Sequence, residues 1–423
     1  MSDTIIADST GAPPRGGAAA RVLYISYDGL MEPLGQSQVF AYLRGLSDRH
    51  DIVLVSFEKP EDLADRERLA RARLDVAQAG IHWHPMRYHR APSLPATLFD
   101  VCAGIGRCVR LHARHRFTLV HARSYVPALM ALALKNIFGV PFIFDMRGFW
   151  ADQRAQSGAW SGQSLAHRGA KWCERRFLLR AGAVVTLTHA AVRVLQNRPD
   201  LPPDGIRYRT IPTCVDLDRF RPGDAGSRPS DPSDRFVLGY VGSVRLWYML
   251  DEMLECFRRL LEIKPGARML IVSRAEHAFI RERAGAAGIP SDCLELVSAA
   301  HADVPDQMRR MHAALFLLKP LSALEAAAPT KMAELLACGV PCLATGGIGD
   351  VEDILIRERV GVVIHSWTDQ ERRDAVRRLV ALAGEPDIRQ RCRDAAGRHF
   401  SLADGIDAYN QLYAELSVGA VHA

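Results

Sequence analysis

The segment Pro329-Thr-Lys-Met-Ala-Glu-Leu-Leu-Ala-Cys-Gly-Val-Pro341, followed by the apolar run Cys342-Leu-Ala-Thr345, decides how this chain is expected to fold. Proline presets the backbone of a first helical turn, and glycine followed by proline ends a helix, so the pattern predicts a helix and then a strand. A buried strand directly after a helix is typical of an α/β sheet that is covered by helices.

The same helix predicts a binding site at its N-terminus. The first backbone N–H groups of a helix have no partner within the helix, so they attract anions such as phosphate. Lys331 would add a positive charge in that turn, and Glu334, one turn later, could accept hydrogen bonds from sugar or ribose hydroxyls. The combination favours a sugar nucleotide that contains a diphosphate.

Short apolar runs alternate with helical patterns along most of the chain, which predicts parallel sheets with helices on both faces. The expected strands are 22–26, 52–56, 119–121, 142–145, 183–187, 209–211, 237–241, 269–272, 294–297, 314–318, 342–344 and 361–364. The stretch 221–235 is rich in Pro, Gly, Ser and Asp, and it is predicted to be an interdomain linker.

The chain is therefore predicted to be α/β, with two doubly wound Rossmann-like domains that face each other across a cleft. The expected organisation is a disordered tail over 1–20, an N-terminal domain over 21–215, a linker over 216–235, a C-terminal domain over 236–395 and a C-terminal helical stretch over 396–423. Ligands of open α/β sheets bind beyond the carboxyl ends of the strands, so the cleft is the expected site.

The composition is that of a globular protein with a mild excess of positive charge. Of the 423 residues, 48% are hydrophobic and 24% are charged, and the formal net charge is +6. This excess suits anionic ligands or a membrane surface. The basic residues form neither one dense patch nor a known motif, so nucleic-acid binding is not expected.

Cysteine usage indicates a reducing compartment. The nine cysteines are an odd number and no two have CxxC spacing, which predicts a cytoplasmic protein with no disulfide framework and no zinc site. No signal peptide is evident. The most apolar stretch, 126–144, contains two prolines, a lysine and an asparagine, so it is predicted to be a core helix and a strand rather than a membrane span.

Four motifs in order resemble those of the retaining family-4 (group 1) glycosyltransferases of GT-B fold, in particular bacterial members of the polysaccharide-assembly type. They are the opening segment, Tyr27-Asp-Gly-Leu-Met-Glu-Pro-Leu-Gly-Gln-Ser-Gln38, Ile211-Pro-Thr-Cys-Val-Asp216 and Gly239-Tyr-Val-Gly-Ser-Val-Arg-Leu-Trp-Tyr-Met249. The resemblance implies an acceptor-side first domain, a nucleotide-sugar-binding second domain and a last helix that crosses back to the first.

The resemblance also assigns residues in the first domain. Gly35 and Gln36 would contact the diphosphate of the donor, and Ser37 the acceptor; the alternative is an ordinary strand–helix turn with Ser37 as N-cap. His121 and Arg123 end an expected strand and are candidate contacts to the acceptor or the sugar, although a lone histidine is more often structural.

Arg147 is a candidate catalytic residue, because many members have a histidine there that hydrogen-bonds the donor sugar. Its planar guanidinium group could form two parallel hydrogen bonds to a phosphate or a carboxylate. The alternative is a salt bridge with Asp145 or Asp152, and Asp145 is itself a candidate sugar or acceptor contact.

In the second domain the sequence departs from the family pattern. The family usually has an arginine directly after Gly242 and a lysine five residues later, and both neutralise the diphosphate; Ser243 and Tyr248 stand at these positions. Arg245 or Lys331 would then supply the charge, and Gly242, Ser243 and Arg245 are donor-binding candidates. Tyr248 is expected to pack rather than to stack on a base.

The opening segment corresponds to the family motif with two glutamates. Glu334 matches the second glutamate, whereas Ala326 stands in place of the first. Glu334 and Lys331 are therefore candidate catalytic residues, and Pro329 and Thr330 join them as donor-binding candidates. The alternative for Glu334 is a surface pair with Lys331 three residues before it.

The loop after the expected strand 342–344 is a further donor-binding candidate. Backbone amides at Gly347 could hold sugar hydroxyls or phosphate. Asp350, three residues later, is expected to be the N-cap of the next helix.

The function implied by the resemblance is transfer of a sugar, with retention, from a UDP- or GDP-sugar to a glycan or lipid-linked glycan, in exopolysaccharide, capsule or O-antigen biosynthesis. No DxD motif or metal-ligating cluster is evident, so no metal is expected. The basic, partly apolar segments 107–116 and 168–180 predict peripheral contact with the inner face of the cytoplasmic membrane, with solvated helix faces as the alternative.

Two alternatives stay open. A non-catalytic GT-B partner subunit with a degenerate donor site is supported by Ser243, Tyr248 and Ala326. A nucleotide-sugar epimerase would need convergent acid and base carboxylates in the first domain, and no such pair is evident near Arg147.

Overall fold

The structure is a computed structural model that describes residues 20–223, 235–274, 276–300 and 302–418. Residues 1–19 of the predicted tail and 224–234 of the predicted linker lie outside the described residues.

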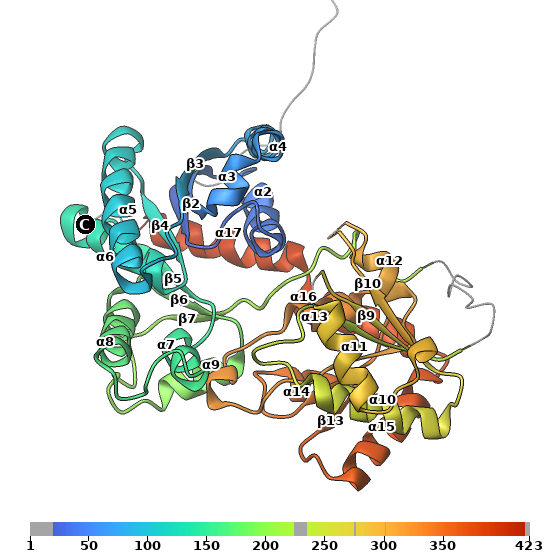
Figure 1. The fold of residues 1–423 in the computed structure, drawn as a ribbon. Helices are drawn as coiled ribbons and strands as arrows, with labels where there is room; N and C mark the ends of the chain where they lie inside the picture. Colours follow the sequence, from blue (N-terminus) through green and yellow to red (C-terminus); the bar gives the residue numbers. More distant parts are fainter. Residues whose placement is uncertain (1–19, 224–234, 275, 301, 419–423) are drawn as a thin grey trace, which may run out of the picture.

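Two parallel sheets form the two halves of the molecule (Figure 1). The first has the order β3-β2-β1-β4-β5-β6-β7, with β1 (Arg21–Ser26), β2 (Asp51–Glu58), β3 (His82–Arg87), β4 (Leu119–Arg123), β5 (Phe142–Met146), β6 (Ala183–Thr186) and β7 (Tyr208–Thr210). The second has the order β10-β9-β8-β11-β12-β13, with β8 (Val237–Val241), β9 (Arg268–Val272), β10 (Leu294–Val297), β11 (Ala313–Phe316), β12 (Cys342–Thr345) and β13 (Gly361–Ile364). The predicted α/β fold class with two doubly wound domains is confirmed.

All twelve strands expected from the sequence are present, with ends within two residues of the prediction. The sequence missed β3, which lies at the edge of the first sheet. Its residues are half-buried or exposed, and Pro85 interrupts the run, so it has none of the apolar character of a central strand.

Helices cover both faces of each sheet. In the first domain, one face packs against α5 (Ser93–His115), α6 (Tyr125–Phe138), α8 (Leu165–Arg180) and α9 (His189–Gln196), and the other against α2 (Ala41–Leu46), α4 (Arg66–Gln78) and α17 (Leu402–Val418). In the second, one face packs against α12 (Val304–Arg309), α13 (Thr330–Ala337), α14 (Val351–Arg357) and α16 (Ile388–Phe400), and the other against α10 (Leu250–Ile263), α11 (His277–Ala286) and α15 (Asp369–Ala383). Short helices connect these elements: α1 (Pro33–Gly35), η1 (Gln36–Phe40), α3 (Pro60–Ala64), α7 (Trp150–Gln156), η2 (Ser291–Cys293) and η3 (Ser322–Leu324).

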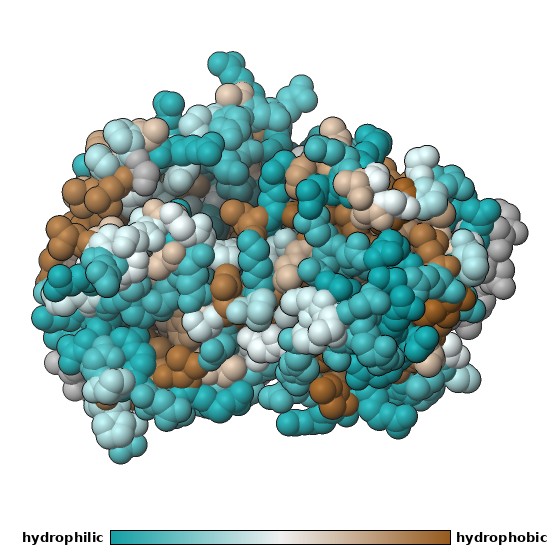
Figure 2. All heavy atoms as spheres, turned by 60° about the horizontal axis from the view of Figure 1, so that its bottom comes forward, coloured by the Kyte–Doolittle hydropathy of each residue, from teal (hydrophilic) through white to brown (hydrophobic). Residues whose placement is uncertain are grey.

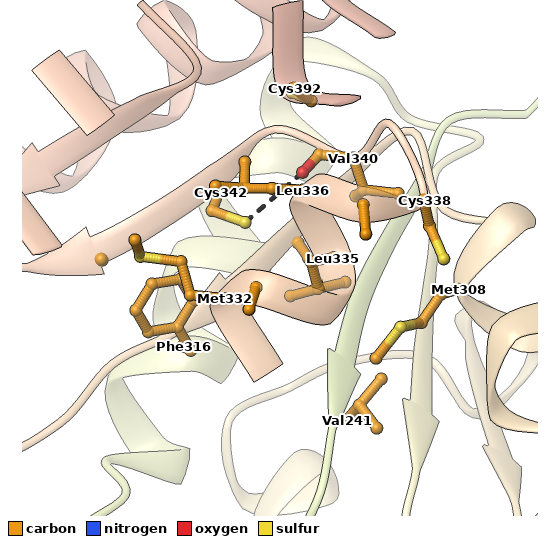
Figure 3. Packing of buried hydrophobic residues seen from close by; sticks show 14 of the residues in the cluster. Val241, Met308, Phe316, Met332, Leu335, Leu336, Cys338, Val340, Cys342 and Cys392 are labelled. Atoms are coloured by element: carbon orange, nitrogen blue, oxygen red, sulfur yellow. Dashed lines mark hydrogen bonds between the residues drawn. The ribbon is translucent and has the colours of Figure 1, made fainter. Parts of the chain in front are cut away.

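Helix α13 is fixed by its apolar face. Met332, Leu335 and Leu336 are buried in the core of the second domain, and Figure 3 shows Met332 beside Phe316 of β11. Gly339 ends the helix with φ of +78°, a backbone conformation that glycine adopts without strain. The predicted helix and strand are thus present, and their packing fixes where the N-terminus of α13 points.

The last helix, α17, belongs to the first domain. In Figure 1 this red helix lies beside the blue elements of the N-terminal sheet. Tyr409, Leu412 and Tyr413 are buried in the same core cluster as Val22 and Tyr24 of β1. The first domain therefore includes the last described helix of the chain.

Replacing Leu412 by alanine should lower the free energy of unfolding by roughly 2–5 kcal/mol, because a buried leucine is lost and a cavity is left. Urea unfolding followed by circular dichroism measures this. Gln411→Ala, an exposed position on the same helix, is the control and should change the stability little. Equal effects of the two changes would mean that α17 does not pack as described.

Candidate functional site

The structure brings the N-terminus of α13 next to the loop that follows β8. Gly242, in this loop, has φ of +120°, and a Cβ atom added there would lie 2.8 Å from Nζ of Lys331. Glycine is needed at this position for both reasons. Gly242 and Lys331, from two motifs about ninety residues apart, therefore form one site.

Lys331 lies between two aromatic rings beneath this loop. Its ammonium group donates a hydrogen bond of 3.1 Å to Oη of Tyr240 and lies 3.7 Å from the ring centre of Tyr248. Tyr248, at the position where the resemblance implies a lysine, contacts Lys331 by a cation–π interaction. The expectation that Tyr248 packs is confirmed.

Burial shifts both ionisable groups of α13 toward neutrality. Burial lowers the pKa of Lys331 to about 7. Burial also raises the pKa of Glu334 to about 7, and the nearby Lys331 opposes this rise. Within the described part of the chain no hydrogen bond or ion pair to the Glu334 carboxylate is found, and Lys331 is buried and Glu334 half-buried, so the alternative of a surface pair with Lys331 is wrong.

A carboxylate occupies the loop after Gly242. Oε1 of Glu276 lies 2.5 Å from Nε of Arg245, and its other oxygen accepts hydrogen bonds from the Ser243 hydroxyl (3.4 Å) and the Val244 N–H (3.3 Å). The Arg245 guanidinium also lies 4.3 Å from the ring centre of Phe279. The two predicted donor contacts, Ser243 and Arg245, thus meet an internal anion that the sequence did not predict.

A cavity of about 520 Å³ opens beside this loop. It is lined by Gly242 and Ser243 after β8, by Ser273 and Glu276 after β9, and by Pro33 of the first domain. Both strands end here, so the cavity lies at the carboxyl edge of the second sheet, where α/β proteins bind ligands.

The first-domain candidates next to Pro33 are part of a helix rather than a glycine turn. Gly35 is helical, and a Cβ atom there would lie 2.0 Å from the Gly29 carbonyl oxygen. Gln36 donates to the Leu30 carbonyl at 2.7 Å. The Ser37 hydroxyl donates to the Pro33 carbonyl at 3.0 Å. The alternative with Ser37 as N-cap is wrong, because the helix begins at Pro33.

Arg147 forms a salt bridge with Asp145, as the alternative interpretation of Arg147 predicted. Its guanidinium lies 3.4 Å from the Asp145 carboxylate, whereas Asp152 pairs with Lys171. Burial would raise the pKa of Asp145, but Arg147 and the hydrogen bond from His121 hold it well below its usual range.

His121 and Asp145 are only 1% exposed, so in this conformation no ligand reaches them. Nε2 of His121 lies 3.5 Å from Oδ2 of Asp145. Nδ1 of the same ring lies 2.7 Å from Oη of Tyr413. Arg123 lies 3.8 Å from the same carboxylate. Four predicted residues therefore form one internal network, and their contacts to sugar or acceptor stay a prediction.

A second cavity of about 520 Å³ lies at the carboxyl edge of the first sheet. Its walls are aromatic and cationic: Tyr27, Phe57, Tyr88, Tyr125 and Trp150, with Lys59, Arg90, Arg123 and Arg154. Lys59 pairs with Glu32 at 2.9 Å, and Arg154 lies over the Trp150 ring. Sequence reasoning missed Tyr88 and Arg90, which follow the unpredicted strand β3.

The two domains touch through the loop before α13 and the loop before α14. Asp350 accepts hydrogen bonds from the backbone N–H groups of His189 (2.6 Å) and Ala190 (2.9 Å), at the start of α9. Asp350 stands at the N-cap position of α14 (Val351–Arg357), as predicted, but its carboxylate makes no capping hydrogen bond there and caps a helix of the opposite domain instead. Ala326, 2% exposed, packs in the core cluster of the first domain.

Gly347 has φ of +75°, and a Cβ atom there would have no neighbour within 4 Å. This loop is therefore open enough for a ligand to approach. Among the residues that the structure describes, no three His, Cys, Asp or Glu side chains gather as a metal site would require. No described helix has the length and apolarity to cross a membrane.

Comparison with known proteins gives two consecutive family matches. The model "Glycosyltransferase Family 4" matches residues 35–219, and "Glycosyl transferases group 1" matches residues 227–399. A D-inositol 3-phosphate glycosyltransferase of Segniliparus rotundus is 25% identical over 309 residues, which are 70% of this chain and 66% of the relative. The match thus spans just under two thirds of that relative.

Solved structures share the whole architecture. Sucrose-phosphate synthase from Thermosynechococcus elongatus has a TM-score of 0.73 at 15% identity, over 95% of this chain and 100% of that chain. HepE of Anabaena, in complex with UDP, has a TM-score of 0.66 at 14% identity, over 93% of this chain and 100% of that chain. The predicted GT-B fold is thus confirmed.

Replacing Lys331 by methionine should stabilise the fold by an amount that depends on pH. Between pH 7 and 10.5 the unfolded chain keeps a proton on Lys331 that the folded chain lacks, so the stability of the wild type rises with pH. The advantage of the variant should therefore be greatest at and below pH 7. It should shrink by about 1.4 kcal/mol per pH unit above that.

Urea unfolding of both proteins at pH 7, 8 and 9 measures this difference. Lys264→Met, at an exposed lysine, is the matched control and should show no such trend. A constant gap between Lys331→Met and the wild type across this range would mean that Lys331 is not buried as described.

Proposed function

This chain belongs to the group 1 glycosyltransferases, with a first domain of family 4, and on that premise we propose that it moves a sugar from a UDP- or GDP-linked donor to a glycan or lipid-linked glycan acceptor. The observation that carries the donor half of the proposal is the close approach of Lys331, in the first turn of α13, to Gly242, which lines a cavity that reaches Pro33 of the first domain. HepE, which has the same fold, has been solved with UDP and with UDP-glucose, so UDP is the first nucleotide to test.

In the proposed donor complex, the diphosphate lies between the loop after β8 and the start of α13. The backbone N–H groups of the first turn of α13, which begins at Thr330 after Pro329, stabilise its charge together with Lys331 and Arg245. Gly35, Gln36 and Gly347 contribute loop and backbone contacts. Glu334, which has no hydrogen-bond or ion-pair partner among the described residues, accepts hydrogen bonds from ribose or sugar hydroxyls.

The proposed reaction needs no metal and retains the anomeric configuration. The acceptor hydroxyl oxygen bonds to the anomeric carbon while the bond from that carbon to the diphosphate oxygen breaks, and the leaving phosphate takes the acceptor proton. Charge builds on the leaving diphosphate, so its stabilisation supplies most of the rate enhancement.

The acceptor is proposed to bind in the first-domain cavity. Four cations (Lys59, Arg90, Arg123 and Arg154) face two carboxylates (Asp28 and Glu32) there, and several aromatic rings provide flat surfaces for a sugar. This balance supports an acceptor with negative charge, such as the diphosphate of a lipid-linked glycan. The relative from Segniliparus is named for an inositol phosphate, also an anion.

An epimerase is less well supported than a transferase. Asp28 and Glu32 are the carboxylates of the first-domain cavity, and each is paired with a cation, Arg123 at 3.3 Å and Lys59 at 2.9 Å. Neither is free to act as an acid or a base in this conformation. A role in exopolysaccharide, capsule or O-antigen assembly, in the cytoplasm, completes the proposal.

Calorimetry with UDP, GDP and uridine tests the donor site. The wild type should bind one nucleoside diphosphate more tightly than its nucleoside. Lys331→Ala should lower the affinity for that diphosphate by roughly tenfold, about 1.4 kcal/mol, and should lower the affinity for the nucleoside less. Lys264→Ala, at an exposed lysine, is the control. If the wild type binds neither nucleotide, the chain is better explained as a non-catalytic partner subunit.

We further propose that the first domain docks on an anionic membrane. Eight of the thirteen exposed large hydrophobic residues among the described residues lie on α5, α6 and α8: Leu94, Leu98, Phe99, Ile137, Phe138, Leu165, Trp172 and Leu179. Exposed arginines flank them at 107, 110, 114, 116, 168, 175, 176 and 180. The three helices form one layer, and Figure 2 shows hydrophobic surface at the end of the molecule that the first domain forms.

Sedimentation with lipid vesicles tests membrane docking. The wild type should sediment with vesicles that contain phosphatidylglycerol and far less with pure phosphatidylcholine, because arginines supply part of the binding. The double variant Leu98→Ser, Phe99→Ser should bind several-fold less. Ile356→Ser, at an exposed isoleucine of α14, should bind like the wild type. A wild type that stays in solution with both vesicle types would refute the docking.

A further inference from the structure

The loop that should receive the donor diphosphate already holds an anion from the chain itself. The Glu276 carboxylate accepts hydrogen bonds from the Ser243 hydroxyl and the Val244 N–H, and it pairs with Arg245 at 2.5 Å. Three hydrogen-bond donors thus converge on one carboxylate: a hydroxyl, a backbone N–H and a guanidinium. Such a set of donors also binds phosphate.

We propose that Glu276 is an internal competitor that the donor diphosphate displaces, so that this residue sets the affinity for the donor. This inference rests on the proposed donor site at Gly242 and Lys331. Two anions cannot share these three hydrogen-bond donors, because like charges at such distances repel. Every binding event therefore includes the free energy of breaking the contacts of Glu276.

The structure shows why the carboxylate can leave. Glu276 has φ of +73°, which is unfavourable for a residue with a side chain, and it stands at the N-cap of α11 without a side-chain capping bond. Its side chain is 17% exposed and lines the cavity. Two of its three contacts are long, at 3.3 and 3.4 Å. A small rotation would move it into solvent.

Arg245 is held in place without Glu276. Its guanidinium lies 4.3 Å from the ring centre of Phe279, on the first turn of α11, and its side chain is 56% exposed. Once the carboxylate moves away, this stacked guanidinium faces the cavity as a fixed cation. Arg274 lines the cavity itself and adds a second cation near the loop after β8.

The opposite role for Glu276 makes a different prediction. If its carboxylate were a brace that orients Arg245 toward the diphosphate, its removal would weaken donor binding. If it is a competitor, its removal strengthens binding, and only for ligands that carry the phosphates. The sign of the change therefore separates the two roles.

Calorimetry with UDP, GDP and uridine on the wild type, Glu276→Gln and Glu282→Gln tests the proposal. Glutamine keeps the size of the side chain and removes its charge, and Glu282 is an exposed glutamate of the same helix that serves as the matched control. Glu276→Gln should bind the preferred diphosphate roughly tenfold more tightly, about 1.4 kcal/mol, with uridine unchanged. Glu282→Gln should match the wild type.

A double-mutant cycle with Arg245→Ala shows whether the effect passes through the proposed contact. The gain from Glu276→Gln should shrink when Arg245 is absent, because the carboxylate is then less firmly held. Thermal melting checks that each variant is folded, and Glu276→Ala replaces the glutamine variant if that one melts early.

The outcomes separate this inference from the donor site itself. If the wild type binds a diphosphate and the Glu276 variants bind it equally or more weakly, the competitor role is refuted and the donor site stands. If only the Glu276 variants bind, the competitor role is supported strongly. If no protein binds UDP or GDP, the proposed donor site is refuted, and the competitor role with it.

Discussion

The ammonium group of Lys331, buried between the rings of Tyr240 and Tyr248 under Gly242, is the contact on which the donor site depends. It ties the first turn of α13 to the loop after β8, and a side chain on residue 242 would separate them. Removing this charge from water costs free energy, and for that reason burial lowers the pKa of Lys331 to about 7. An anion bound next to this amine would raise its pKa and favour the charged form.

The sequence predicted the framework because parallel strands leave a strong signal. Central strands such as β8 and β12 are apolar throughout, and turns with Gly242 or Gly339 show where the chain needs a positive φ. The edge strand β3 is half-exposed and contains a proline, so neither apolarity nor alternation marks it. Missing β3 also meant missing Tyr88 and Arg90, which form part of the first-domain cavity.

The remaining gaps in the predicted site concern contacts between distant segments. His121 meets Tyr413, 292 residues later in the chain, and this contact places the histidine in an internal network. Asp350 stands before a helix, as an N-cap would, yet its carboxylate caps α9 of the other domain. No local pattern distinguishes these partners from nearer ones. Glu276 belongs to the same class, since it lies four residues after β9 and yet contacts the loop after β8.

The return of the chain to the first domain has a mechanical consequence. Val215, which leaves the first domain, pairs with Ser401, which re-enters it: the Val215 N–H donates to the Phe400 carbonyl at 2.8 Å, and the Leu402 N–H donates to the Val215 carbonyl at 3.2 Å. Two backbone crossings side by side resist twisting far more than one flexible linker does. We therefore expect the axis of any relative rotation of the two domains to lie near this pair, and the cavity that such a rotation would change is the one lined by both Pro33 and Gly242.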